Sequence, residues 1–168
     1  MEKFTTKQLG NIGESKTLDA FVEMGIPVYI PYGDNEKADL VAEFNGKLNK
    51  IQVKSSLKIE DGLITVDVSS THRKGGKSVR ETYSVEDVDY FSIFNYESKL
   101  LILIPSNIVG GKTQLKIRYP YKESTNQYKN INWEDYTFDK IVGNGWCDES
   151  CTIGSNPIPN ALAPRRGF

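Results

Sequence analysis

Four polar residues of the chain are of the types that hydrolytic chemistry needs: Glu14, Asp39, Gln52 and Lys54. Carboxylate and amide oxygens are ligands for Mg²⁺, which binds through one or two carboxylates and keeps several waters. A lysine beside such an ion can position or deprotonate the attacking water, or stabilise developing negative charge. Together these groups could hydrolyse a phosphodiester, provided that the fold brings them to one place.

The chain supplies a local reason for three of them to meet. Residues 38–44 and 47–55 read as two strands, and the Asn45-Gly46 dipeptide between them is a strong signal for a β-hairpin. If this dipeptide closes a two-residue turn, residue 44 pairs with residue 47, and every pair of residue numbers sums to 91. The turn therefore fixes the register of the whole hairpin.

This register places Asp39 directly opposite Gln52, and Lys54, two residues further on, points to the same face. Asp39 is the best candidate for a metal ligand. The side-chain oxygen of Gln52 and the backbone carbonyl of Val53 could complete the protein's share of the ligands. Lys54 would act on the water, and nearby carboxylates would hold it by electrostatics. Each feature alone is commonplace, since a strand Asp opposite a Gln is often an ordinary surface pair.

Glu14 falls in a predicted helix that Thr5 or Thr6 can cap and that ends at Gly25 and Pro27. A helical wheel puts Glu14 at the centre of an apolar stripe, where a carboxylate without a partner would cost several kcal/mol. The stripe is formed by Leu18, Phe21, Val22 and Met24.

Either the apolar stripe ends one turn earlier, or Glu14 has a positive group to face. A metal ion would account for it, bound directly or through a water, and a salt bridge with Lys37 or Lys50 is the alternative. Gly10 and Gly13 precede it and could allow the helix to approach its neighbour closely.

Composition bounds the class of protein. With 168 residues and 38% hydrophobic residues, the chain is expected to form one domain with a packed core. Its longest aliphatic run, Leu100–Ile104, is far too short to span a bilayer, and the N-terminus lacks the apolar core of a signal peptide. An intracellular, cytoplasmic protein is therefore expected. Two cysteines cannot build a disulfide scaffold, and the single histidine, His72, argues against histidine-rich metal sites and histidine-based triads.

The net charge of −1 hides two basic segments. Residues 47–80 carry eight Lys and Arg against three acids, and residues 112–129 carry five against one. A solvated surface is the simpler explanation, but two such segments on one face could bind a polyanion. A flexible basic loop is predicted at 71–80. The candidate DNA contacts are Arg73, Lys74, Lys77, Arg80, Lys116 and Arg118.

The remaining pattern indicates a mixed α/β (α+β) domain over residues 1–142. Further strands are expected at 28–30, 63–68, 88–95, 100–104 and 115–119, with a turn or short helix at 131–136. The composition then shifts to Gly, Asn, Pro and Ser, so residues 143–168 read as a weakly ordered tail. Cys147 and Cys151 in this tail lack two further ligands for zinc and are expected to be free thiols.

The order of these features resembles the core of the PD-(D/E)XK nuclease superfamily, which has an acid on a helix, then a second acid and a (D/E)-x-K triplet on antiparallel strands. Here these are Glu14, Asp39 and Gln52-Val53-Lys54. The likeness is greatest to endonucleases associated with group I introns, and archaeal Holliday-junction resolvases are more distant. Two positions depart from the pattern: Ala38 stands where the family has Pro, and Gln52 stands where it has an acid. Members of the intron-associated branch also have Gln at the second position.

The resemblance implies a restriction-endonuclease-like core, with a mixed central β-sheet, an N-terminal helix and flanking helices. It implies a site-specific DNA endonuclease that depends on Mg²⁺, for which Mn²⁺ could substitute. Asp39, Gln52, Val53 and Glu14 would bind the metal, and the catalytic residues would be Glu14, Asp39, Gln52 and Lys54.

Partners and alternatives follow from the same chemistry. Cleavage of double-stranded DNA needs two active sites, so a homodimer or homotetramer is expected. A Holliday-junction resolvase or a restriction-type nuclease would use the same site. A DNA-binding module that lost its activity through Gln52 is the alternative from another class, followed by a structural protein with an accidental constellation.

Overall fold

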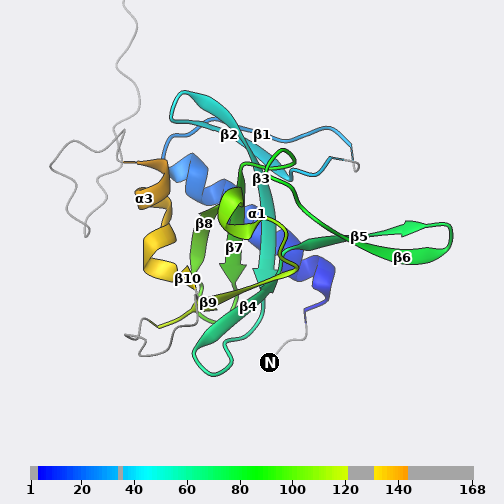
Figure 1. The fold of residues 1–168 in the computed structure, drawn as a ribbon. Helices are drawn as coiled ribbons and strands as arrows, with labels where there is room; N and C mark the ends of the chain where they lie inside the picture. The colour runs from blue at the N-terminus through cyan, green and yellow to red at the C-terminus, as the bar shows by residue number, and fades with distance from the viewer. Residues whose placement is uncertain (1–3, 34–35, 121–130, 144–168) are drawn as a thin grey trace, which may run out of the picture.

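The structure, a computed structural model, describes residues 4–33, 36–120 and 131–143 of the chain. Its centre is a five-stranded sheet in the order β1-β2-β3-β7-β8, in which β3 and β7 are parallel and the other neighbours antiparallel (Figure 1). The strands are β1 (Val28–Tyr29), β2 (Leu40–Phe44), β3 (Lys47–Ser56), β7 (Tyr90–Asn95) and β8 (Leu101–Pro105). The predicted mixed central sheet is confirmed.

Helices cover one face of this sheet, and a smaller sheet covers the other. On one face, α1 (Thr6–Glu23) and α3 (Phe138–Val142) meet through Phe21 and Phe138, whose ring centroids lie 5.0 Å apart. The opposite face packs against a three-stranded sheet of β4 (Leu63–Asp67), β9 (Gln114–Arg118) and β10 (Ile131–Asn132). Two short helices complete the fold, α2 (Ser106–Val109) and η1 (Trp133–Tyr136). None of the described helices is long and apolar enough to cross a membrane.

The hairpin β2–β3 has the predicted register, with Phe44 opposite Lys47 at the turn. Asn45 and Gly46 adopt positive φ angles of 54° and 70°, which a type I′ turn requires and which these two residue types tolerate. β2 begins at Leu40, two residues later than expected, because its pairing with β3 ends there.

β3 is longer than β2, and this leaves part of its edge open. It pairs with β2 as far as Ile51, whereas residues 52–56 pair only with β7 within the described chain. Asp39 stands just before β2 begins, and its backbone N–H donates to the Ile51 carbonyl at 2.9 Å. Asp39 therefore lies at the fork, the point at which β2 and β3 part.

Helix α1 begins as predicted but presents a different face to the sheet. Thr5 is its N-cap and forms a capping box with Gln8. Val22, which was expected in the buried stripe, is 60% exposed, and Glu14 is also exposed instead of central to the stripe. Small residues line much of the contact because the helix lies close to the sheet. The buried residues of the helix are Gly13, Thr17 and Phe21.

The predicted flexible loop at 71–80 is wrong, because this segment forms a second hairpin. β5 (Ser69–Lys74) and β6 (Lys77–Thr82) pair antiparallel and project from the body of the molecule (Figure 1). Gly75 and Gly76 form the turn, with positive φ angles of 58° and 77°. A Gly-Gly dipeptide is itself a hairpin signal when strand-forming residues flank it.

The other predicted strands are confirmed, with ends that differ by one or two residues. α2 and α3 were not predicted, because four or five residues are too few to show a helical period. The segment 131–136 opens with β10 and continues as η1. Residues 144–168, which include Cys147 and Cys151, lie outside the described residues.

Candidate active site at the fork of β2 and β3

Asp39 is the centre of the candidate site. Its Oδ2 accepts a hydrogen bond from the backbone N–H of Val53 at 2.7 Å and another from Nε2 of Gln52 at 2.5 Å. Nε2 of Gln52 also lies 3.3 Å from the carbonyl oxygen of Val53. Asp39 and Gln52, which the hairpin register places opposite each other, therefore meet at the fork beside the backbone of Val53; Asp39 is half-buried and Gln52 is buried.

Helix α1 carries Glu14 to the fork because it lies directly on β3. A Cβ added to Gly13 would stand 2.1 Å from Oγ of Ser55, so only glycine fits at this crossing without a shift. One turn further on, Oγ1 of Thr17 lies 2.7 Å from Oγ of Ser92 on β7. The position of Glu14 is thus set by the close contact of its neighbour with the sheet.

The carboxyl groups of Glu14 and Asp39 are near enough to interact. The pKa of Glu14 lies above its ordinary value, because partial burial removes some of the water around its carboxyl and because Asp39 adds negative charge. Burial also raises the pKa of Asp39, although hydrogen bonds and the Lys54 ammonium counteract part of this effect. A divalent cation would relieve both costs, since it would compensate two negative charges at once.

The alternative partners for Glu14 are engaged elsewhere. Nζ of Lys37 lies 2.7 Å from a carboxylate oxygen of Asp87, and Nζ of Lys50 donates to the backbone carbonyl of Glu86 at 2.8 Å. These contacts account for both lysines, so the salt bridge to Glu14 that the sequence left open is not the arrangement found.

Lys54 occupies a half-buried position beside Asp39. Burial lowers the pKa of its ammonium, while the carboxylates of Asp39 and Asp67 act in the opposite direction. Nζ donates to the backbone carbonyl of Ser69 at 3.1 Å and to the hydroxyl of Tyr83 at 3.4 Å. The two carboxylates that act on Lys54 are therefore Asp39, which was expected, and Asp67, which was not.

Sequence reasoning missed Asp67, Ser69 and Tyr83. They lie at the end of β4, at the start of β5 and just after β6, so the second hairpin brings them to Lys54. The Gly-Gly turn between two strand-like runs was the available signal. The predicted flexible loop at 71–80 gives no reason for the two ends of that segment to lie side by side.

The protein groups at the fork suit a hard cation such as Mg²⁺. Asp39 and Glu14 offer carboxylate oxygens, and Val53 offers a backbone carbonyl. Gln52 presents its NH₂ group to Asp39, so its amide would have to turn over to offer an oxygen. The described residues contain no group of three or more His, Cys, Asp or Glu that could hold a metal, and the donors at the fork are instead a mixture of side-chain and backbone oxygens.

The basic residues predicted to contact DNA do not form one cluster. Arg80 forms a solvent-exposed salt bridge with Asp67 of the same chain. Lys77 is exposed and lies beside the turn of the hairpin β5–β6. The side chains of Arg73 and Lys74 on the same hairpin lie outside the described residues.

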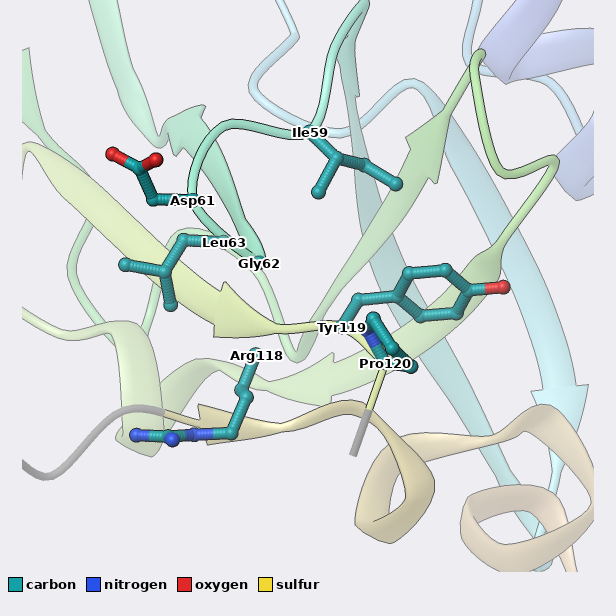
Figure 2. Close-up of a pocket in the computed structure, with 7 residues that line it drawn as sticks. All are labelled: Ile59, Asp61, Gly62, Leu63, Arg118, Tyr119 and Pro120. Atoms are coloured by element: carbon teal, nitrogen blue, oxygen red, sulfur yellow. The ribbon is translucent and has the colours of Figure 1, made fainter. Parts of the chain in front are cut away.

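Lys116 and Arg118 lie on β9 and form a separate group. Arg118 pairs with Leu63 at the first residue of β4, whereas Asp67 is the last, about 13 Å further along the strand. Figure 2 shows Arg118 beside a hollow at this end of the small sheet. Neither residue joins the groups at the fork.

Comparison with known proteins agrees with the fold. The chain is similar to a solved bacterial homing endonuclease, I-Ssp6803I, with 27% sequence identity and a TM-score of 0.62 over 79% of this chain and 88% of that one. MepB is 16% identical over 69% of this chain and 85% of that one, and its TM-score of 0.38 is too low to carry an argument. No protein of curated function matches the chain.

A model of the PD-(D/E)XK endonuclease family matches residues 4–139. The match includes α1, the hairpin β2–β3 and therefore every residue at the fork. Since it spans most of the sequence, the chain belongs to the PD-(D/E)XK endonuclease family.

Proposed function

We propose that this protein is a Mg²⁺-dependent, site-specific endonuclease that hydrolyses phosphodiester bonds in duplex DNA, in the manner of a homing endonuclease. The observation that carries the proposal is the fork, where two carboxylates, an amide, a backbone carbonyl and a lysine share one edge of the sheet. The similarity to a bacterial homing endonuclease over most of both chains supports the site-specific reaction.

The residues at the fork divide the work. Asp39 and Glu14 would hold the ion through their carboxylates, and the Val53 carbonyl with the turned amide of Gln52 would complete the protein ligands. When bound, Mg²⁺ would lower the pKa of a coordinated water and offset the charge of the phosphate oxygens. The ammonium of Lys54 would hydrogen-bond the attacking water or stabilise the charge that develops at phosphorus, and its partial burial strengthens that effect.

Duplex DNA is the partner that this chemistry and the basic residues of the sequence support. Arg73, Lys74 and Lys77 on the hairpin β5–β6 would contact phosphates, with Lys116 and Arg118 as a second group. Arg80 instead forms a salt bridge with Asp67 and so would stabilise the base of the hairpin. One site cuts one strand, so a homodimer or homotetramer would make a double-strand break.

A DNA-binding module without activity is the second candidate, and one contact favours it. The Gln52 amide donates to Asp39 and therefore satisfies a carboxylate oxygen that a metal would otherwise take. Such a module would bind DNA with a steep dependence on salt and would cut none.

The test uses supercoiled plasmids that carry a randomised insert, incubated with the protein in Mg²⁺. We expect a subset of inserts to be cut and to share a sequence, which sequencing of the linear products identifies. Cutting of synthetic four-way junctions without sequence preference would indicate a resolvase instead.

Variants then assign the site on the selected target. Asp39→Ala should lower the cleavage rate by about a hundredfold or more while binding is retained. Asp19→Ala, on the exposed surface of α1, is the matched control and should cut as the wild type does. Equal cleavage by both variants would remove Asp39 from the site, and binding without cleavage by the wild type would favour the inactive module.

A further inference from the structure

The ammonium of Lys54 is held by groups to which the proposed reaction gives no role. Besides the Ser69 carbonyl and the Tyr83 hydroxyl, the ring of Tyr83 lies close, with its centroid 5.1 Å from Nζ. A cation near an aromatic face is attracted electrostatically by the ring, and more strongly when the cation is desolvated. Three separate contacts therefore fix one end of a side chain that has four rotatable bonds.

Both holding residues belong to the base of the hairpin β5–β6. Ser69 is the first residue of β5 and pairs with Thr82, the last of β6, and Tyr83 follows directly. The hairpin therefore reaches Lys54 from both of its strands, while its turn lies in the part that projects into solvent (Figure 1).

Hydrogen bonds lock this base. Oδ1 of Asp67 accepts from the backbone N–H of Ser69 at 2.9 Å and from its hydroxyl at 2.6 Å. Nε of Arg80 donates to the same hydroxyl at 2.6 Å, and the guanidinium also bonds Asp67. Ser69 is thus held by its backbone pairing in β5 and by the hydrogen bonds of its hydroxyl. These contacts fix the position of the carbonyl that accepts from Lys54.

Packing fixes Tyr83 in the same way. The residue is only 8% exposed, and its ring meets that of Phe91 edge to face with centroids 5.3 Å apart. Burial, with some contribution from nearby carboxylates, raises the pKa of Tyr83 to about 12. The hydroxyl therefore stays neutral and accepts from Lys54 without forming an ion pair that would hold the ammonium away from a phosphate.

We propose that Tyr83 is a positioning residue for Lys54 and that the base of the hairpin β5–β6 sets where the ammonium stands. The inference rests on the proposed function, in which Lys54 acts at the reacting phosphate. Displacement of a catalytic group by about 1 Å can lower the rate a hundredfold. Contacts that hold the Lys54 ammonium in place would therefore raise the cleavage rate.

The first test separates binding from cleavage. Tyr83→Phe keeps the ring and its packing but removes the hydroxyl. We expect a three- to tenfold lower single-turnover rate on the selected target at saturating protein, a smaller loss than misplacement by about 1 Å would cause. The dissociation constant for the same DNA, measured in EDTA, should stay within twofold. Tyr29→Phe is the matched control, because its hydroxyl also has one partner at 3.4 Å, the carboxylate of Glu43, away from Lys54.

The second test needs no activity. In protein with ¹³C-labelled lysine, the Lys54 methylene signals should be shifted by the ring current of Tyr83. Tyr83→Leu should move them to the positions of an ordinary lysine, and Tyr29→Leu should leave them in place. Unchanged signals in Tyr83→Leu would overturn the proposed contact.

Lys54→Ala separates the role of Lys54 in cleavage from the positioning role of Tyr83. If it cuts as the wild type does, the role of Lys54 in the proposed function is wrong. If it does not cut while Tyr83→Phe cuts at the full rate, the function stands and the positioning role of Tyr83 is overturned.

Discussion

Gln52 is the residue at which this chain departs from the family pattern, and the structure gives it a defined place. It is 8% exposed, and its NH₂ group donates to Asp39 and lies near the Val53 carbonyl. An acid at this position would add a third carboxyl to the fork and would lose both donor contacts. Gln52 thus lowers the negative charge of the fork and stabilises it when no cation compensates that charge.

Gln52→Glu should therefore make stability depend more strongly on metal. In EDTA we expect the free energy of unfolding to fall by about 2 kcal/mol, because a buried carboxylate at position 52 would face the half-buried carboxylate of Asp39 without a donor between them. Mg²⁺ should raise the thermal midpoint of this variant more than that of the wild type, since binding to the folded state stabilises it. Gln114→Glu, exposed on β9, is the control, and an equal response to metal in both variants would exclude Gln52 as a ligand.

For individual residues, the sequence predicts those positions that a local turn determines. Asp39, Gln52 and Lys54 could be placed together because a two-residue hairpin fixes its own register. Tyr83 could not, because its contact with Lys54 depends on how two hairpins lie against each other, which no spacing in the sequence records.

The crossing of α1 over β3 positions the helical acid, and one glycine controls it. The Cβ position of Gly13 is 2.1 Å from Oγ of Ser55 and 3.3 Å from a methyl of Val53, whereas Gly10 on the same helix has open space. The sequence raised both glycines as candidates for a close approach, and the structure assigns this role to Gly13. The wheel misplaced the buried face because it counts apolar residues and passes over small ones such as Thr17.

Gly13→Ala should lower the free energy of unfolding by about 2 kcal/mol, because the helix must move away from the strand. Gly10→Ala should raise it by up to about 1 kcal/mol, since alanine favours a helix where nothing obstructs it. Chemical denaturation measures both. Ser55→Ala removes the obstructing oxygen, so adding it to Gly13→Ala should recover part of the loss; no recovery would show that the contact is not the cause.

The hairpin β5–β6 projects from the body of the molecule (Figure 1). It carries exposed Lys77 beside its turn, whereas the carboxyl groups of Glu14 and Asp39 lie at the fork. The order of elements and the mixed sheet could be predicted from the sequence. The projection of the hairpin β5–β6 could not be predicted, because it depends on which part of the hairpin packs against the body of the fold.

Lys77→Ala should weaken DNA binding about equally for all sequences and lower the slope of log K against log salt by about one per protomer bound. Lys16→Ala, on the exposed surface of α1 and paired with Asp19, should leave the slope unchanged. Fluorescence anisotropy over a salt series measures the slope. If both variants keep the slope of the wild type, the end of the hairpin does not contact DNA.

The open edge of β3 has a consequence for solubility as well as for chemistry. An unpaired strand edge can recruit a strand from another molecule and so start aggregation. Beyond Ile51, the Val53 N–H on this edge is occupied by the carboxylate of Asp39. The same acid that would bind the metal thus also occupies a backbone donor to which a strand from another molecule could pair, and replacing it with alanine would leave that donor without this partner.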